Sequence, residues 1–525
     1  MQAVILAGGR GTRLKEVTGD LPKPLMDIDG KPLLVRQLEL MRASGIDDVL
    51  LLTGYRTDVI KAAIGDGRHY GVRLDYEDED ENNPLGTAGA LLSSHHRLQD
   101  RFVVVYGDCM LNVDIRRMIA WHEKKKADAS LLVHPNDHPE DSDLIEADRD
   151  GKIIAFHAYP HSQTTFLPNL VNAALYVIEK SAISPYRDRW LDRHGTNAKP
   201  DIAKHLFPQM LVDGVHLCAY RSPEYIKDAG TPARYARVVR DFRSGRIARA
   251  ALSNQQRAIF LDRDGTLNVE VGRVASPQAL TLIEGVAQAV RRINESEYRA
   301  IVVTNQPVLA RGDCDERTLF QIHAKLDTLL GREGAYLDAL YYCPHHPHGG
   351  YPGEVSDLKI DCDCRKPKSG LLLAAQADLN IDFSQSWMIG DTTIDMRTAE
   401  TLGIRSLLVE TGKAGKDDTF DTSPCYRAET LAQAVTFIVE RHPTLLSRAL
   451  DLTAQWQHGD SILLQGDGDL TLWRSLIQEA CQLKKLAISL ALPGLNAVEP
   501  LADWRVIISG DFVTQESNLG GAVRA

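Results

Sequence analysis

Short apolar runs rich in Val, Ile and Leu recur along the whole chain and constrain its fold more than any other feature. Runs of this length and composition are typical of buried strands. Where such strands alternate with helical stretches, they usually form parallel sheets covered by helices on both faces. The first part of the chain contains VILAGG, DDVLLLTG, FVVVYGD, ASLLVHP and ALYVIEK, the second AIFLDRD, AIVVTNQ, SWMIGD and IRSLLVE, and the third SILLQGD, LAISLAL and WRVIISG. An α/β protein made of several such sheets is therefore predicted.

The length sets the number of domains. A chain of 525 residues exceeds the size of a single hydrophobic core, so we expect roughly two to four domains. A polar stretch rich in small residues at 241–257 indicates a helical connector, and a second boundary is expected near His442 and Pro443. The predicted division is 1–238, a linker at 239–255, 256–440, and a short α/β segment at 441–525.

Charge and composition exclude several classes of protein. The net charge of −11 argues against nucleic acid as the main partner, because binding to a phosphate backbone needs a basic surface. No apolar stretch approaches about 18 residues, so no membrane span is expected. The N-terminus has no basic leader, and eight cysteines in this length do not make a disulfide framework. Three of those cysteines lie close together and suggest metal binding, so we expect a cytoplasmic protein.

A glycine-rich loop follows the first apolar run directly. Glycines allow backbone N–H groups to approach a phosphate closely, and nearby arginine and lysine side chains supply positive charge. Two cations, one in the loop and one in the following LPKPL segment, suit a triphosphate. The residues expected to bind it are Gly8, Gly9, Gly11, Thr12, Arg13 and Lys23.

The motifs GGRGTRL and LPKPL resemble those of the sugar-1-phosphate nucleotidyltransferases, over roughly residues 1 to 238. These Rossmann-like enzymes join a nucleoside triphosphate to a sugar 1-phosphate and release pyrophosphate. By this resemblance Gly86 and Thr87 contact the base and the sugar, and Asp108 and Asp228 hold one Mg²⁺. Mg²⁺ prefers oxygen ligands, and the chemistry needs mainly positioning and charge neutralisation.

One segment departs from the family pattern. Where the family has Phe-x-Glu-Lys-Pro, with a lysine that holds the sugar phosphate, this chain reads Phe156-His157-Ala158-Tyr159-Pro160. His157 is either a substitute for that lysine or an ordinary surface histidine. The family's Asn-Ala-Gly is matched by Asn172-Ala173-Ala174, which makes Asn172 a candidate for contact with the sugar.

The second part of the chain carries a pair of aspartates at the end of an apolar run. Asp262 and Asp264 point the same way from a strand end, which suits a nucleophile beside a general acid. The sequence Asp-x-Asp-Gly-Thr resembles the haloacid-dehalogenase superfamily, whose phosphatases form an aspartyl-phosphate.

By this second resemblance, Asp262 attacks phosphorus, and Asp264 protonates the leaving oxygen and later activates water. Thr304 and Lys366 hold the phosphoryl oxygens. Asp391 binds Mg²⁺ together with Asp262, and the backbone carbonyl of Asp264 completes the set. Mg²⁺ and the lysine are needed because a carboxylate is repelled by an anionic phosphate unless its charge is neutralised.

A cluster of cysteines and histidines lies between these motifs. Cys343 and His345 in CPHHP, with Cys362 and Cys364 in CDC, have the composition of a structural Cys₃His zinc site. Zinc would join the ends of a polar loop that has little core of its own. His346 is the alternative imidazole, and resemblance favours His345. The remaining cysteines show no such spacing.

The combination CPHHP…CDCRKP resembles the D-glycero-D-manno-heptose 1,7-bisphosphate 7-phosphatases and their relatives the histidinol-phosphate phosphatases, over roughly residues 256 to 438. Here zinc would orient the loop that carries Arg365 and Lys366. By resemblance Arg365 contacts the distal phosphate of the substrate, and Asn305 and Gln306 line the same pocket.

Together the two resemblances predict consecutive steps toward a nucleotide-activated heptose, because the product of the phosphatase is the acceptor of the transferase. The guanylyl donor rests on resemblance alone. Two alternatives stay open: a hexose-1-phosphate nucleotidyltransferase joined to a histidinol-phosphate-type phosphatase, and an active phosphatase joined to a non-catalytic binding domain. The tail is expected to be a degenerate α/β lobe that packs or mediates self-association, with the turn at 464–469 faintly similar to sugar-phosphate isomerase domains.

Overall fold

The computed structural model describes residues 1–9, 11–14, 19–162, 164–194, 199–452, 461–465, 470–484, 489–491 and 504–508. The chain divides into two compact units. The first comprises Met1–Phe260 and Val271–Ser386, and the second comprises Leu261–Glu270 and Trp387–Ala525. No helix in the described ranges is long and apolar enough to cross a membrane.

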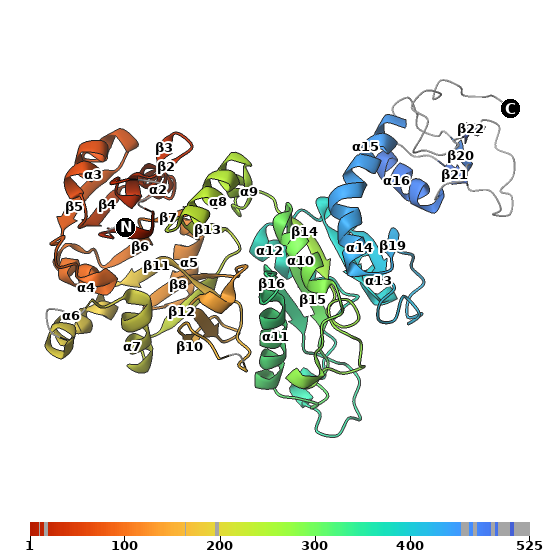
Figure 1. The fold of residues 1–525 in the computed structure, drawn as a ribbon. Helices are drawn as coiled ribbons and strands as arrows, with labels where there is room; N and C mark the ends of the chain where they lie inside the picture. The colour runs from red at the N-terminus through yellow and green to blue at the C-terminus, as the bar shows by residue number, and fades with distance from the viewer. Residues whose placement is uncertain are drawn as a thin grey trace. The chain divides into compact units, whose positions relative to one another are not determined.

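The N-terminal part of the first unit is built on a nine-stranded sheet (Figure 1). Its strands are β1 (Gln2–Ala7), β4 (Asp48–Thr53), β5 (Arg73–Asp78), β6 (Arg101–Tyr106), β8 (Ala129–His134), β9 (Leu144–Ala147), β10 (Ile153–His157), β11 (Val171–Glu179) and β12 (Leu217–Arg221). The main order is β10-β9-β11-β6-β1-β4-β5, and β8 pairs with β11 and β12. Two small two-stranded sheets join β2 (Asp27–Ile28) with β3 (Lys31–Pro32) and β7 (Cys109–Asn112) with β13 (Tyr225–Asp228).

Helices cover both faces of the sheet. Side chains of one strand alternate between these faces, so neighbouring residues pack in different apolar clusters. Ile5 of β1 packs in one apolar cluster with residues of α2, α3 and α5, whereas Val4 packs in another with residues of α4, α6 and α7. The helices here are α2 (Leu33–Ala43), α3 (Thr57–Ile64), α4 (Gly86–Ser93), α5 (Ile115–Lys125), α6 (Lys180–His194), α7 (Phe207–Val212), α8 (Pro232–Arg243) and α9 (Arg246–Arg249).

The expected parallel pairing holds for only part of this sheet. β1 runs parallel to β4 and β6, and β4 to β5, but β11 runs antiparallel to β6 and β8. In the run ALYVIEK the four residues 175–178 are all buried, and such an apolar run does not reveal whether the strand is parallel or antiparallel to its neighbours. The α/β fold class is confirmed, with a mixed first sheet.

A six-stranded sheet has the order β16-β15-β14-β17-β18-β19. Its strands are β14 (Arg257–Leu261), β15 (Tyr298–Asn305), β16 (Ala339–Cys343), β17 (Trp387–Gly390), β18 (Arg405–Val409) and β19 (Tyr426–Ala428). The pairs β15–β16, β17–β18 and β18–β19 are parallel. The associated helices are α10 (Val286–Glu295), α11 (Glu316–Gly331), α12 (Gly370–Leu379), α13 (Thr393–Glu400) and α14 (Leu431–Thr436).

The tail contributes α15 (His442–Leu452), α16 (Leu470–Leu483) and a parallel sheet of β20 (Ser461–Gln465), β21 (Ser489–Ala491) and β22 (Trp504–Ile508). α14 leads through a π-helical turn, Phe437–Arg441, directly into α15. Glu479 of α16 lies 2.6 Å from Arg405 and 2.8 Å from His442, so the tail helices are tied to β18. Of the turn at 464–469 that was compared with isomerase domains, residues 464 and 465 end β20, and 466–469 lie outside the described residues.

Candidate active sites and metal centre

A cavity of about 220 Å³ lies where β1 and β6 end. Six residues expected from the sequence to bind the nucleotide or its metal line it: Gly8, Gly9, Lys23, Gly86, Thr87 and Asp108. Arg13 ends in an exposed side chain on a short 3-10 turn, and Arg10 lies outside the described residues. The hydroxyl of Thr87 lies 2.9 Å from an Asp201 carboxylate oxygen and accepts the N–H of Ile202. Thr87 therefore also fixes the chain at the rim of the cavity.

A carboxylate also lines this cavity that the sequence had not singled out. Glu79 follows β5 directly, and one of its oxygens accepts the N–H of Leu85 at 3.0 Å. The other lies so close to Gly8 that a Cβ there would overlap it. Burial raises the pKa of Glu79, and the Leu85 N–H opposes that rise. Glu79 was not predicted because it belongs to the acidic run Glu77–Glu81, which is typical of a solvated surface.

The two carboxylates expected to hold Mg²⁺ lie together. β13 pairs with β7, which brings Asp228 opposite Cys109, and the N–H of Ala229 donates to the Asp108 carbonyl at 2.8 Å. A Cβ built on Gly230 would lie 3.0 Å from an Asp228 oxygen and 3.8 Å from an Asp108 oxygen. Both carboxylates thus face one small space, which fits a single oxygen-liganded cation.

Each of these carboxylates is paired with one positively charged side chain. Lys23 Nζ lies 2.7 Å from Asp108, and Arg234 Nη1 lies 3.1 and 3.0 Å from the two oxygens of Asp228. Lys23 was expected at this site, but Arg234 was not. Arg234 is the only cationic side chain in the first turn of α8, six residues after Asp228, and that placement is the signal that could have revealed it.

The expected sugar side contains a strained alanine. Ala174 has φ of 56°, the left-handed conformation that glycine adopts without cost, and its N–H donates to the Asn172 side chain at 3.4 Å. The register of β11 shifts between Asn172 and Tyr176. His157 is half-buried, and its Nε2 lies 3.1 Å from a carboxylate oxygen of Glu146. It is therefore already engaged with a carboxylate.

In the second unit, the aspartates of the Asp-x-Asp motif follow the buried strand β14. Asp262 N–H donates to Ile389 of β17 at 3.0 Å, and its carboxylate accepts the Arg263 N–H at 2.7 Å. Asp264 is held by the fully buried guanidinium of Arg263 at 2.8 and 2.9 Å and by the Asn268 amide at 3.0 Å. Both carboxyl groups are thereby fixed by their own loop.

Asp391 lies beside Asp262 in the same unit. Asp262, Asp391 and Asp395 each offer an oxygen, and the three oxygens lie within 4.8 Å of one another. Oδ1 of Asp391 is buried without a hydrogen-bond partner. Burial, and next the charge of Asp262, raise the pKa of Asp391 to about 8. An orphaned carboxylate oxygen among like charges fits a bound cation such as Mg²⁺.

Asp395 was not predicted as a ligand. It stands four residues after Asp391 and forms a capping box with Thr392 at the start of α13. The spacing of four residues between Asp391 and Asp395, at the start of a helix, is the sequence signal that could have revealed this ligand. The loop conformation also requires a glycine, because Gly265 has φ of 79° and a Cβ there would overlap Asp391.

The remaining predicted phosphatase residues lie in the first unit. Asn305, at the end of β15, exchanges two hydrogen bonds with the backbone of Lys366, at 2.9 and 3.1 Å. The Gln306 amide donates to the Thr304 hydroxyl at 3.0 Å. Arg365 donates to the His345 carbonyl at 3.2 Å, and burial lowers its pKa. The Asn305 side chain is thus joined to the backbone of Lys366, and the Gln306 side chain to that of Thr304.

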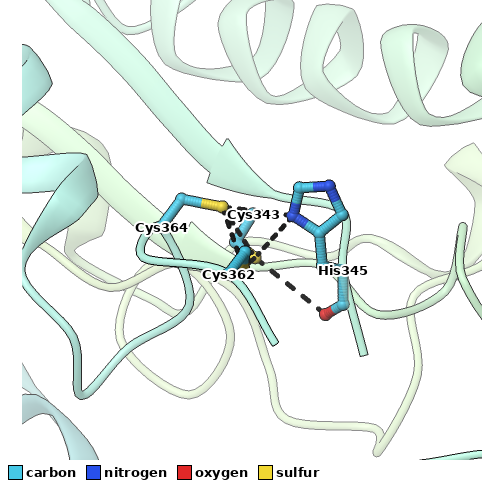
Figure 2. A group of neighbouring side chains, drawn as sticks. All are labelled: Cys343, His345, Cys362 and Cys364. Carbon is cyan, nitrogen blue, oxygen red and sulfur yellow. Dashed lines mark hydrogen bonds between the residues drawn. The ribbon is translucent and has the colours of Figure 1, made fainter. Parts of the chain in front are cut away.

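The cysteine and histidine cluster is the clearest candidate metal centre (Figure 2). Cys343 Sγ lies 3.5 Å from Cys362 and 3.2 Å from Cys364, and His345 Nδ1 lies 3.3 Å from Cys364. Ligands at about 2.3 Å from a tetrahedral zinc would stand about 3.8 Å apart, so a small expansion accommodates the ion.

The structure selects His345 over His346. His345 Nδ1 points at the three sulfurs in Figure 2, whereas His346 Nε2 lies 3.0 Å from an Arg311 nitrogen. Burial acts to raise the pKa of Cys362, but hydrogen bonds with the thiols of Cys364 and Cys343 lower it overall. Burial raises the pKa of the Cys343 and Cys364 thiols, so Cys362 is the thiol of the three that is most readily deprotonated to the thiolate that metals bind.

Comparison with known proteins agrees with this arrangement. A nucleotidyl transferase family model matches residues 2–245, and a HAD-hydrolase-like model matches residues 363–434. The chain is 44% identical over 161 residues to a D-glycero-β-D-manno-heptose-1,7-bisphosphate 7-phosphatase of Haemophilus ducreyi, spanning 30% of this chain and 86% of that protein. The chain belongs to this phosphatase family.

The phosphatase relatives match only one part of the chain, and a transferase matches another part. A mannose-1-phosphate guanylyltransferase of Mycobacterium tuberculosis is 29% identical over 284 residues, covering 54% of this chain and 73% of its own length. A crystal structure of a D,D-heptose 1,7-bisphosphate phosphatase from B. bronchiseptica with magnesium and phosphate is 29% identical, covers 35% of this chain and 99% of its own, and has a TM-score of 0.31. The two family models and the phosphatase relatives together show a chain that joins a nucleotidyltransferase domain to a phosphatase domain of this family.

Proposed function

We propose that this chain performs two successive steps of nucleotide-activated heptose synthesis. The phosphatase part, residues 256–440, removes the 7-phosphate of D-glycero-D-manno-heptose 1,7-bisphosphate. The transferase part, residues 1–238, joins GMP from GTP to the resulting heptose 1-phosphate and releases pyrophosphate. The observation that carries the proposal is the presence of both sites in one chain, because the product of the first is the acceptor that the second requires.

In the phosphatase step, Asp262 attacks phosphorus and forms an aspartyl-phosphate as the sugar oxygen leaves. Asp264 gives that oxygen a proton and then takes one from the water that hydrolyses the intermediate. Asp262, Asp391 and Asp395 would hold Mg²⁺, which supplies the charge neutralisation that an anionic nucleophile needs. Thr304 and Lys366 bind the phosphoryl oxygens.

The zinc cluster has a structural role in this proposal. Cys343, His345, Cys362 and Cys364 would supply all four ligands of a zinc ion and leave none of its positions open for a substrate. The cluster is next to Arg365, whose guanidinium donates to the His345 carbonyl. Zinc bound there would orient Arg365 toward the distal phosphate of the sugar without taking part in the chemistry.

In the transferase step, Glu79 supports guanine as the base. An ionised carboxylate offers two adjacent acceptors, and guanine is the base whose Watson–Crick edge presents two adjacent donors, N1–H and the N2 amino group. Adenine, thymine and cytosine each place an acceptor beside their donor. Against a carboxylate, that acceptor would be repelled by one of the two oxygens. Leu52, Pro84 and Ala90 line the same cavity and suit the faces of a flat base.

Glu79→Gln is expected to lower kcat/KM for GTP by about tenfold or more, because one acceptor of the pair becomes a donor that opposes the guanine edge. The preference for GTP over ATP and dTTP should shrink in the same variant. Initial rates with each nucleotide and a fixed sugar 1-phosphate measure both effects. Glu81→Gln, a matched change in the same acidic run, should leave them unchanged, and an unaltered GTP preference in Glu79→Gln would refute this reading of the base.

A further inference from the structure

The transferase site contains a cation that no motif accounts for. Arg234 donates to both oxygens of Asp228, and a third of its side chain is exposed. It is placed by the start of α8, where the Thr231 hydroxyl accepts the Arg234 N–H and Pro232 fixes the first turn. The neighbouring cation Lys227 lies one residue before Asp228 on β13, points to the other face, and lies 3.8 Å from Asp137.

Lys23 and Arg234 are paired with different carboxylates of the candidate metal site, Lys23 with Asp108 and Arg234 with Asp228. A Cβ at Gly230 would lie 3.6 Å from Lys23 Nζ, close to oxygens of both Asp108 and Asp228. Lys23 also lines the nucleotide cavity, whereas Arg234 is not among the residues that line it. Lys23 is therefore the cation on the nucleotide side of the site, and Arg234 is available for a different ligand.

Beyond Arg234 lies the loop that joins the expected sugar-side residues. Arg234 is 4.0 Å from Asp141, at the end of the turn Pro139–Asp141. The adjacent Asp143 accepts the N–H of Asn172 at its carbonyl, 3.3 Å, and the N–H of Tyr159 at its side chain, 3.0 Å. The guanidinium thus lies between the metal carboxylates and the loop that supports Asn172.

We propose that Arg234 binds the 1-phosphate of the acceptor sugar. The inference rests on the proposed transferase function and names the residue that recognises its second substrate. In the reaction, an oxygen of the sugar phosphate forms a bond to the α-phosphorus of GTP as the bond to pyrophosphate breaks on the opposite side. The incoming dianion must approach past two carboxylates, and it needs a positive charge to do so.

Among the described residues, the sugar side offers few other positive charges. The segment Phe156–Pro160 contains no lysine or arginine, and its His157 is engaged with Glu146. A guanidinium presents a planar fork that matches two phosphate oxygens, and only one nitrogen of this fork, Nη1, is used on the two oxygens of Asp228. When a cation occupies Asp108 and Asp228, the fork is available to the phosphate.

The test compares Arg234→Gln with Arg234→Lys in the full-length protein. Arg234→Gln should raise KM for heptose 1-phosphate about ten- to a hundredfold, since a charge-assisted hydrogen-bond pair is lost. The KM for GTP should stay within about threefold, because the triphosphate is bound elsewhere. Arg234→Lys should recover part of the loss. Arg240→Gln, on the exposed side of the same helix, is the matched control and should behave as wild type.

Equilibrium binding of mannose 1-phosphate, followed by calorimetry with Mg²⁺ present, gives a readout that does not require turnover. Arg234→Gln should lose this binding while the wild type and Arg240→Gln retain it. Unchanged binding in Arg234→Gln would overturn the inference, as would a raised Mg²⁺ requirement with unchanged KM for the sugar phosphate. If the wild type binds the probe yet transfers no nucleotide to any sugar 1-phosphate, the proposed function fails while the assignment of Arg234 stands or falls on the binding data.

Discussion

Asp262→Asn should abolish phosphate release from heptose 1,7-bisphosphate, with a fall in kcat on the order of 10⁴ or more. Asparagine has nearly the same shape as aspartate but cannot form the aspartyl-phosphate, and it replaces one of the three carboxylates available to Mg²⁺ with a neutral amide. Nucleotidyl transfer from supplied heptose 1-phosphate should continue at the wild-type rate, because Asp108, Asp228 and Lys23 are untouched. A phosphate-release assay and a pyrophosphate-release assay on the same preparation measure the two activities.

Asp357→Asn is a suitable control, since Asp357 is an exposed aspartate outside the predicted site. It should leave both activities and the melting temperature unchanged. If Asp262→Asn melts as the wild type does but has lost both activities, the two reactions share one site and the division into two active sites is wrong.

Removal of the metal from the cysteine cluster should have the second large effect. A structural zinc site contributes on the order of 10 kcal/mol of apparent binding free energy, and that energy stabilises the loop it closes. Cys364→Ala should therefore abolish zinc binding, measured by elemental analysis, and cause loss of phosphatase activity with earlier melting of the phosphatase part. Transferase activity should persist, because the cluster is confined to the segment 343–364.

Cys425→Ala provides the comparison, because Cys425 is exposed and stands outside the cluster. It should retain zinc and both activities. A structural metal site would be contradicted if the protein purified without zinc. It would also be contradicted if the phosphatase part melted at the same temperature before and after treatment with a chelator.

Local sequence could predict those site residues whose backbone is set by adjacent strands and turns. Asp262 and Asp391 end apolar runs, and parallel strands bring their carboxyl ends to one edge of a sheet. The cluster at Cys343, His345, Cys362 and Cys364 could likewise be recognised from residue types and spacing. These predictions depend on short segments, so they needed no knowledge of long-range packing.

Residues that act through long-range contacts could not be found in this way. Glu79 stands in an acidic run and becomes part of a cavity only because β5 and the loop before α4 fold over Gly8. Arg234 becomes significant only through its contact with Asp228. The direction of β11 is also set by tertiary structure, since a buried apolar strand has no sequence signal for its polarity.

The fate of the two phosphates of heptose 1,7-bisphosphate tests the central claim most directly. The substrate, labelled in its 1-phosphate, is incubated with the full-length protein, GTP and Mg²⁺, and the label is followed by mass spectrometry. The account predicts unlabelled inorganic phosphate from position 7 and label retained in GDP-heptose. Phosphate release without formation of a nucleotide sugar would favour a non-catalytic binding domain in place of the transferase. Phosphate release from histidinol phosphate but not from heptose 1,7-bisphosphate would favour a histidinol-phosphate-type phosphatase. Either result, or label appearing as free phosphate, would contradict the proposed pair of reactions.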